Sequence, residues 1–288
     1  MNFFKKYKIY IVIFIFSLMI MLISSLYETN IFYMIKEYIF NPEYKANYAS
    51  NSEVPINFDI NLFNIIKFEL SQYHWTYDYL VIWGTNLFQL LIPIIAAISA
   101  LLFYTKNQTI NKFAVNKNKN YKKFLLKEAT IISFKIAFSI FMAFIVFYIS
   151  SIILSNGATN SNISRNFLLD ILGTDFYYNN TKLYYFIDGF FRLFMIPFIY
   201  SIFACSISMY LKNVKQVFLA PIVYYFGLTL ISYALTNITN LGIYLSPLLA
   251  MVTGAYANIN SLCVMIMPLL SIIISLGAIL WRGKYVEI

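Results

Sequence analysis

Ionisable side chains are scarce inside the apolar runs of this sequence. Asp188 and Arg192 lie near the outer end of one run, four residues apart, the spacing at which a helical Asp–Arg pair forms a salt bridge. Lys135 lies about one turn inside another run, where a lysine extends its ammonium to the membrane interface. We interpret Asp188 and Arg192 as an ion pair at the outer interface, and a role in coupled transport stays open for these groups.

The residues that most intramembrane enzymes need are missing. The one histidine, His74, lies in a predicted outer loop, and no HExxH, GxSxG or paired intramembrane carboxylates occur. Cys205 and Cys263 both lie in apolar runs, without a CxxC metal pair or a disulfide framework. The chain also lacks a Gly-x4-Gly-Lys-Ser/Thr phosphate-binding loop, so any ATPase would be a separate polypeptide. We predict a non-enzymatic chain with no catalytic, cofactor or metal site.

The composition predicts a protein whose outer surface faces lipid. Of 288 residues, 60% are hydrophobic and 11% are charged, whereas about a quarter of the residues in a soluble domain are charged. A helix that crosses the bilayer core needs roughly 20 apolar residues. Six runs predict an all-α domain with spans at about residues 9–26, 81–104, 129–154, 187–211, 216–236 and 259–281. The first run lacks an A-x-A cleavage site, so we expect a retained helix rather than a signal peptide.

The basic residues predict how the spans are oriented. With six spans, fourteen Lys and Arg residues lie in the loops and termini of one side, and five lie on the other. Because cytoplasmic loops carry the basic excess, both termini and loop 105–128 are predicted to be cytoplasmic, and segments 27–80 and 155–186 external. This pattern favours the bilayer, and not nucleic acid, as the partner of the net positive charge. The stretch 241–257 is shorter and contains glycine and proline, which predicts a re-entrant or interfacial segment.

Four predicted spans contain a proline near the middle, and small or polar residues recur at helical spacing beside the kinks. The prolines are Pro93, Pro197, Pro221 and Pro268, and the polar residues include Asn86, Gln89, Ser201, Tyr225, Thr229, Ser232 and Tyr233. A proline removes a backbone hydrogen bond and kinks a helix. Two interpretations stay open for these residues: close helix packing, or a translocation path or dimer seam lined by amide, hydroxyl and phenol groups.

The loop 105–128 is the longest and most basic predicted cytoplasmic connection. Its first part places Ile110, Phe113 and Ala114 on one side of a short helix. One interpretation is a basic anchor that is attracted to anionic lipid. The other is a docking element whose apolar side enters a groove on a cytoplasmic partner.

This arrangement resembles the membrane subunits of ATP-binding-cassette exporters of the type-2 (type V) family. That family shares six spans, cytoplasmic termini, a coupling helix in the loop between spans two and three, and short external helices after span five, which YLSPLLAMVTG (Tyr244 to Gly254) resembles. The N-terminal tail of about eight residues is shorter than in many members, and the first outer loop is longer than in the drug and polysaccharide exporters. The chain looks more like the small bacterial branches that export peptides, toxins or antibiotics, such as the staphylococcal exporters of phenol-soluble modulins.

The resemblance implies a permease in a bacterial cytoplasmic membrane, which forms the export path for an amphipathic or hydrophobic substrate. It implies no cofactor in this chain, two copies of a separate ATPase subunit that use ATP, and a second permease copy or relative. Ile110, Phe113 and Ala114 would then couple the permease to the ATPase. Two other classes stay open: a stand-alone channel or secondary carrier, and a non-transporting membrane scaffold or immunity protein.

Overall fold

Helices make up the regular structure of this protein. The computed structural model describes residues 3–28, 31–49, 61–72, 77–114, 121–155, 157, 167–251 and 261–286, and these ranges contain no strand. The elements are α1 (Phe3–Glu28), α2 (Ile31–Phe40), α3 (Pro42–Ala49), α4 (Leu62–Gln72), α5 (Tyr77–Asn86), η1 (Leu87–Leu90), α6 (Ile92–Ala114), α7 (Tyr121–Leu154), α8 (Phe167–Leu172), α9 (Thr174–Asn179), α10 (Thr181–Phe190), the π-helical turn η2 (Phe191–Met195), α11 (Ile196–Ser208), α12 (Val214–Thr236), η3 (Asn240–Leu245), η4 (Leu249–Met251), α13 (Ser261–Val264) and α14 (Ile266–Val286).

Within the described residues, four helices are long and apolar enough to cross a membrane, in agreement with the predicted all-α membrane fold. They cover Tyr7–Tyr27, Lys122–Leu154, Thr181–Ser208 and Val214–Thr236. A fifth span results if Tyr79–Leu90 and Ile92–Asn107, which meet at 52°, cross the membrane together. The apolar part of α14, Ile266–Trp281, is a shorter helix. The count of six spans and the side on which each loop lies therefore stay predictions.

Three helix boundaries differ from those expected. α6 continues to Ala114, so the first ten residues of the predicted loop 105–128 are helical. α7 begins at Tyr121, and α10 begins at Thr181, six residues before the predicted span. The difference has a simple cause, because hydropathy ends a span at the first charged residues, whereas helical backbone hydrogen bonds continue past them.

α11 lies at the centre of the bundle, where α6, α7 and α14 pack against it. α1 packs on α7 and α5, and α12 packs on α6 and on the turn η3. In the span Thr181–Ser208, 61% of the apolar window is buried inside the protein, against 28% in α1 and 22% in α12. α1 and α12 are therefore peripheral helices, with a smaller buried share than the span Thr181–Ser208.

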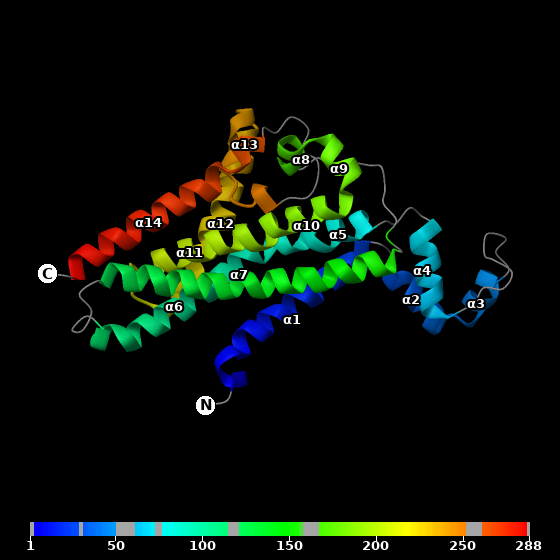
Figure 1. Cartoon of the computed structure of the whole chain (residues 1–288), viewed down its shortest axis with the longest axis horizontal. Coiled ribbons are helices and arrows are strands. Elements are labelled where there is room, and N and C mark those ends of the chain that lie inside the picture. The colour runs from blue at the N-terminus through cyan, green and yellow to red at the C-terminus, as the bar shows by residue number, and fades with distance from the viewer. Residues whose placement is uncertain are drawn as a thin grey trace.

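The two ends of the bundle carry different segments. The N-terminal end of α1, the C-terminal end of α14 and the adjoining ends of α6 and α7 lie on the left side of the bundle in Figure 1. The short helices α2, α3 and α4 lie at the opposite end, and α8 and α9 lie along the upper right. The segments predicted to be cytoplasmic thus share one side, and the segments predicted to be external lie away from it.

The four prolines occupy two kinds of position. Pro93, Pro197 and Pro268 lie in the first turn of α6, α11 and α14, each directly after a break or a change of helix type. A proline is tolerated in the first turn of a helix because its missing N–H has no intrahelical partner there. Pro221 lies inside α12, and Pro197 lies inside the continuous helical run Thr181–Ser208, shortly after its π-helical turn. The expectation of a mid-helix proline is therefore wrong for Pro93 and Pro268, each of which follows a break between two helical pieces, whereas Pro197 and Pro221 lie inside long helices.

Two glycines allow α7 to pack closely against both α5 and α10. A Cβ atom on Gly84 would lie 2.2 Å from Cζ of Phe147, and a Cβ on Gly189 would lie 2.1 Å from Cζ of Phe144. Phe144 and Phe147 are three residues apart on one face of α7, and both rings are buried. Each glycine thus forms a notch that receives one phenylalanine ring, which fixes the distance of α5 and α10 from α7.

We predict that Gly189→Ala destabilises the protein by about 1–3 kcal/mol, because the added methyl group must displace the packed Phe144 ring. The matched control is Gly227→Ala in α12, where a Cβ would meet no atom within 4 Å and alanine is the better helix former. Thermal unfolding in detergent should therefore give a lower Tm for Gly189→Ala and an unchanged or higher Tm for Gly227→Ala. Equal Tm values for the two variants would contradict the role of the notch.

Candidate functional site

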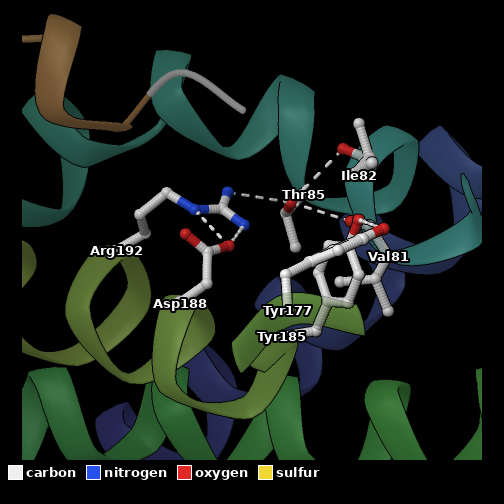
Figure 2. Close-up of polar contacts among 7 residues, drawn as sticks. All are labelled: Val81, Ile82, Thr85, Tyr177, Tyr185, Asp188 and Arg192. Carbon is white, nitrogen blue, oxygen red and sulfur yellow. Dashed lines mark hydrogen bonds and ion pairs between the residues drawn. The ribbon is translucent and has the colours of Figure 1, made fainter. Parts of the chain in front are cut away.

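The most unusual polar contact in the bundle joins Asp188, Arg192 and Thr85. Arg192 Nε donates a hydrogen bond to Asp188 Oδ2 at 2.7 Å, and Nη2 contacts the same oxygen. Arg192 Nη1 donates to Thr85 Oγ1 at 3.1 Å, so the guanidinium reaches from α10–α11 across to α5 (Figure 2). The side chains of Asp188 and Arg192 are 0% and 1% exposed. The pair predicted for the outer interface is therefore enclosed by protein.

Thr85 is held in place by its own helix. Its hydroxyl donates to the carbonyl oxygen of Val81 at 2.8 Å, with Ile82 as a second acceptor at 3.3 Å (Figure 2). The hydroxyl proton is thereby directed to the α5 backbone, and the oxygen lone pairs stay available to the guanidinium. Thr85 directly follows Gly84, and Asp188 directly precedes Gly189. The glycine notches of α5 and α10, into which the two α7 rings fit, therefore also set the separation between the hydroxyl and the ion pair.

The π-helical turn η2 positions Arg192. It covers Phe191–Met195 and ends just before Pro197, whose nitrogen cannot donate a backbone hydrogen bond. A π turn widens the helix by one residue and often marks a functional site. This local widening, caused by the approach of a proline, lies where the guanidinium has to turn toward α5.

A cluster of buried tyrosines lies near this contact, on the side of Thr85 and Val81 (Figure 2). Tyr184 and Tyr185 lie one turn before Asp188 in α10, and Tyr177 comes from α9. The rings of Tyr177 and Tyr184 meet edge to face at 5.0 Å, and those of Tyr184 and Tyr185 at 5.4 Å. The hydroxyl oxygens of Tyr177 and Tyr185 are 3.4 Å apart, beside Val81 of α5 (Figure 2). The cluster therefore packs α9 against α10 next to α5.

Ser201 belongs to a packing contact between α6, α7 and α11. The hydroxyl of Ser99 donates to Ser201 Oγ at 2.9 Å, and the thiol of Cys205 donates to the carbonyl oxygen of Ser99 at 3.5 Å. Ser133 Oγ lies 3.9 Å from the sulfur of Cys205. All four side chains are buried. For Ser201, the structure favours the interpretation of close helix packing by small residues.

The polar residues of α12 mostly hold the turn η3 and the segment after it. Ser232 Oγ donates to the carbonyl oxygen of Gly242 at 2.7 Å, and Thr229 Oγ1 lies 3.3 Å from Ser246 Oγ. Tyr225 is fully buried, with its ring 4.6 Å from that of Tyr200. The Tyr200 hydroxyl donates to the carbonyl oxygen of Pro247 at 2.6 Å, whereas the Tyr225 hydroxyl has no partner among the described residues.

Asn86, Gln89 and Tyr233, the remaining residues predicted for the path or seam, take no part in these contacts. Gln89 Nε2 donates to Asn86 Oδ1 at 3.3 Å at the bend between α5 and α6, and both side chains are half-buried. Tyr233 is 73% exposed on the outside of α12. The seven residues predicted as one path or seam therefore fall into internal packing contacts, one local amide pair and one outward-facing phenol.

Two predicted features lie at or beyond the limits of the described residues. Ile110, Phe113 and Ala114 occupy the last turns of α6, and their side chains lie outside the described residues. His74 lies outside the described residues altogether. Among the side chains that the structure does place, no group of three or more His, Cys, Asp or Glu could hold a metal ion.

Sequence reasoning missed Thr85 and the two glycines. The four-residue spacing was enough to pair Asp188 with Arg192, because both lie on one helix. Thr85 is 107 residues away from Arg192, so its role depends on the packing of α5 against α7 and α10. One signal was present in the sequence, since the Gly84–Thr85 pair is a small and polar step inside an apolar run.

We predict that Arg192→Met destabilises the protein by about 3–5 kcal/mol, because it leaves the Asp188 carboxylate buried without its cation. The double variant Asp188→Leu/Arg192→Met removes both charges and should recover a large part of this loss. Thr85→Val should cost about 1.5–3 kcal/mol, the usual value for a hydrogen bond to a charged group. The free energies of unfolding in detergent of Arg192→Met, Asp188→Leu and the double variant together give the coupling energy between Asp188 and Arg192. A double variant as unstable as the sum of Arg192→Met and Asp188→Leu would contradict the ion pair.

Comparison with known proteins assigns no family to this chain. No family model matches the sequence, and neither a curated protein nor a solved structure matches it. The function of the chain is therefore inferred from its own residues and their arrangement.

Proposed function

We propose that this chain is the permease subunit of an ATP-binding-cassette exporter, with six spans and both termini in the cytoplasm of a bacterium. It forms the path for an amphipathic or hydrophobic substrate, and a separate ATPase subunit in two copies supplies the energy. A second copy of the permease or a relative completes the complex. The observation that carries this proposal is the extension of α6 to Ala114, on the side of the bundle where both termini lie (Figure 1).

The extension gives α6 a mostly polar end outside the lipid, in which Ile110, Phe113 and Ala114 are the apolar residues. Lys106 pairs with Glu128 of α7, and charged groups of this kind mark the headgroup region and not the bilayer core. The eight helical residues after Lys106 extend about 12 Å further at 1.5 Å per residue. Ile110 and Phe113 are three residues apart, and Ala114 is four residues after Ile110, so the three share one face of the helix. Such a face suits a groove on a cytoplasmic subunit.

The segment after α12 supports the same proposal. The turns η3 and η4 are too short to span a membrane, and Thr229, Ser232 and Tyr200 hold them against α11 and α12. Leu248 and Leu249, which directly follow Pro247, are also buried. Short helical pieces that are fixed to the last spans resemble the external re-entrant helices expected of the family.

The buried ion pair favours a second candidate, a secondary carrier. Ionisable groups inside a membrane protein are costly and often belong to ion-coupled transport, and Asp188 and Arg192 are both fully buried. Transport in proteoliposomes separates the two proposals. An exporter requires the ATPase subunit and ATP, whereas a carrier works with the permease alone and stops when the ion gradient is collapsed.

The orientation predicts which side a cysteine reagent reaches. In a background that lacks Cys205 and Cys263, Asn118→Cys between α6 and α7 should react only after the cells are opened. Asn179→Cys at the end of α9, where the side chain is exposed, should react in intact cells with a reagent that does not cross the membrane. Labelling at position 118 in intact cells would refute the six-span orientation.

Phe113→Asp should disrupt the contact with the ATPase. Burial of a phenylalanine side chain contributes about 1.5–3 kcal/mol, and the variant loses this term and places a charge in a dry contact. Lys117→Gln and Lys119→Gln are the controls, since exposed charges contribute little and are screened by salt. Co-purification with the ATPase subunit, and the ATP hydrolysis that the permease stimulates, should be lost in Phe113→Asp and retained in both controls. The opposite pattern would mean that this segment acts through its charge.

A further inference from the structure

A groove with both charged and apolar walls opens between α1, α6 and α7. Its volume is about 450 Å³. Lys106 and Lys135 line it with the hydroxyl-bearing residues Tyr10 and Thr105, and Leu102 and Ile131 contribute apolar wall. The groove therefore combines two ammonium groups with a surface that accepts hydrocarbon.

Lys135 is the distinctive residue of this groove. It is half-buried within the apolar helix α7, and its ammonium lies 5.5 Å from the ring centroid of Tyr7 and 5.7 Å from that of Tyr10. No carboxylate among the described residues forms an ion pair with it, whereas Lys106 pairs with Glu128. With one carboxylate against two lysines, the groove has an excess of positive charge. A partly desolvated ammonium in such a place is stabilised by an anion.

The groove lies at the depth of lipid headgroups. α7 contains 34 residues and is about 50 Å long, whereas a bilayer core needs only about 20 residues of helix. Counting 20 residues back from Leu154, the last residue of α7, ends at Lys135. Tyrosines also favour the membrane interface, where Tyr7 and Tyr10 lie beside the ammonium. Lys135 therefore marks the boundary between hydrocarbon and headgroups.

We propose that this groove binds an anionic phospholipid, with the lipid phosphate beside the ammonium of Lys135. The hydroxyl of Tyr10 donates a hydrogen bond to a phosphate oxygen, whereas that of Thr105 already donates to the carbonyl oxygen of Leu101 at 2.9 Å; one acyl chain lies against Leu102 and Ile131. A zwitterionic lipid fits less well, because its own ammonium would add positive charge to a groove that already has an excess. A soluble phosphate would leave the apolar wall uncovered. The inference depends on membrane insertion and goes beyond the proposed transport function.

The test measures lipid binding to the delipidated full-length protein in detergent. Phosphatidylglycerol, phosphatidylcholine and soluble glycerol phosphate are titrated separately, with native mass spectrometry and the shift in Tm as readouts. The variants are Lys135→Gln, which removes the ammonium, Lys135→Arg, which keeps the charge, and Lys123→Gln. Lys123 lies on the same helix but is exposed, so it controls for a general loss of basic charge.

The wild-type protein should bind phosphatidylglycerol more tightly than phosphatidylcholine, and glycerol phosphate should not compete. Lys135→Gln should weaken phosphatidylglycerol binding about fivefold, the effect of one basic residue at an anionic surface. Lys135→Arg and Lys123→Gln should retain wild-type binding. Equal binding of the two lipids, or competition by glycerol phosphate, would overturn the proposal on the wild-type protein alone. An equal loss in Lys123→Gln and Lys135→Gln would also overturn it, because binding would then follow total charge.

Discussion

The absence of water from the hydrocarbon layer governs how this chain places its polar groups, because each donor and acceptor there needs a partner within the protein. Arg192 satisfies this constraint through Asp188 on its own helix and Thr85 on α5. Ser201 accepts a hydrogen bond from Ser99, and Tyr200 donates one to the carbonyl oxygen of Pro247. The polar groups inside the bundle therefore act mainly as connections between helices and turns, and few of them remain available to a substrate.

These connections depend on close helix approach. Thr85 and Asp188 meet through Arg192 because Phe144 and Phe147 fit against Gly189 and Gly84. Pro197 also affects the position of Arg192. It interrupts backbone hydrogen bonding and is preceded by the π-helical turn that carries Arg192. The helix packing and the polar contact therefore depend on each other. A methyl group added at Gly84 or Gly189 would also displace the neighbouring residue, Thr85 or Asp188, from its contact with Arg192.

The sequence predicts whatever depends on local spacing or on composition. Hydropathy predicts the helices, and the four-residue separation predicts the pairing of Asp188 with Arg192. It does not predict that the pair is enclosed, because enclosure depends on the packing of other helices around it, among them α5 with Thr85. Ser201, Thr229 and Ser232 were recognised as small polar residues of a bundle, but their partners lie on other elements. Which partner each of these residues contacts is therefore evident only from the three-dimensional structure.

A helix that leaves the translocon meets lipid before all of its final neighbours are present. A charged residue near the centre of such a helix costs about 2.5–3.5 kcal/mol during insertion. Because Asp188 and Arg192 share one helix, they neutralise each other without a second segment, which lowers this cost during synthesis. α5 is made earlier and offers Thr85 as soon as the new helix docks. Arg192 therefore has Asp188 as its partner while the helix inserts, and it gains Thr85 when the helix packs against α5.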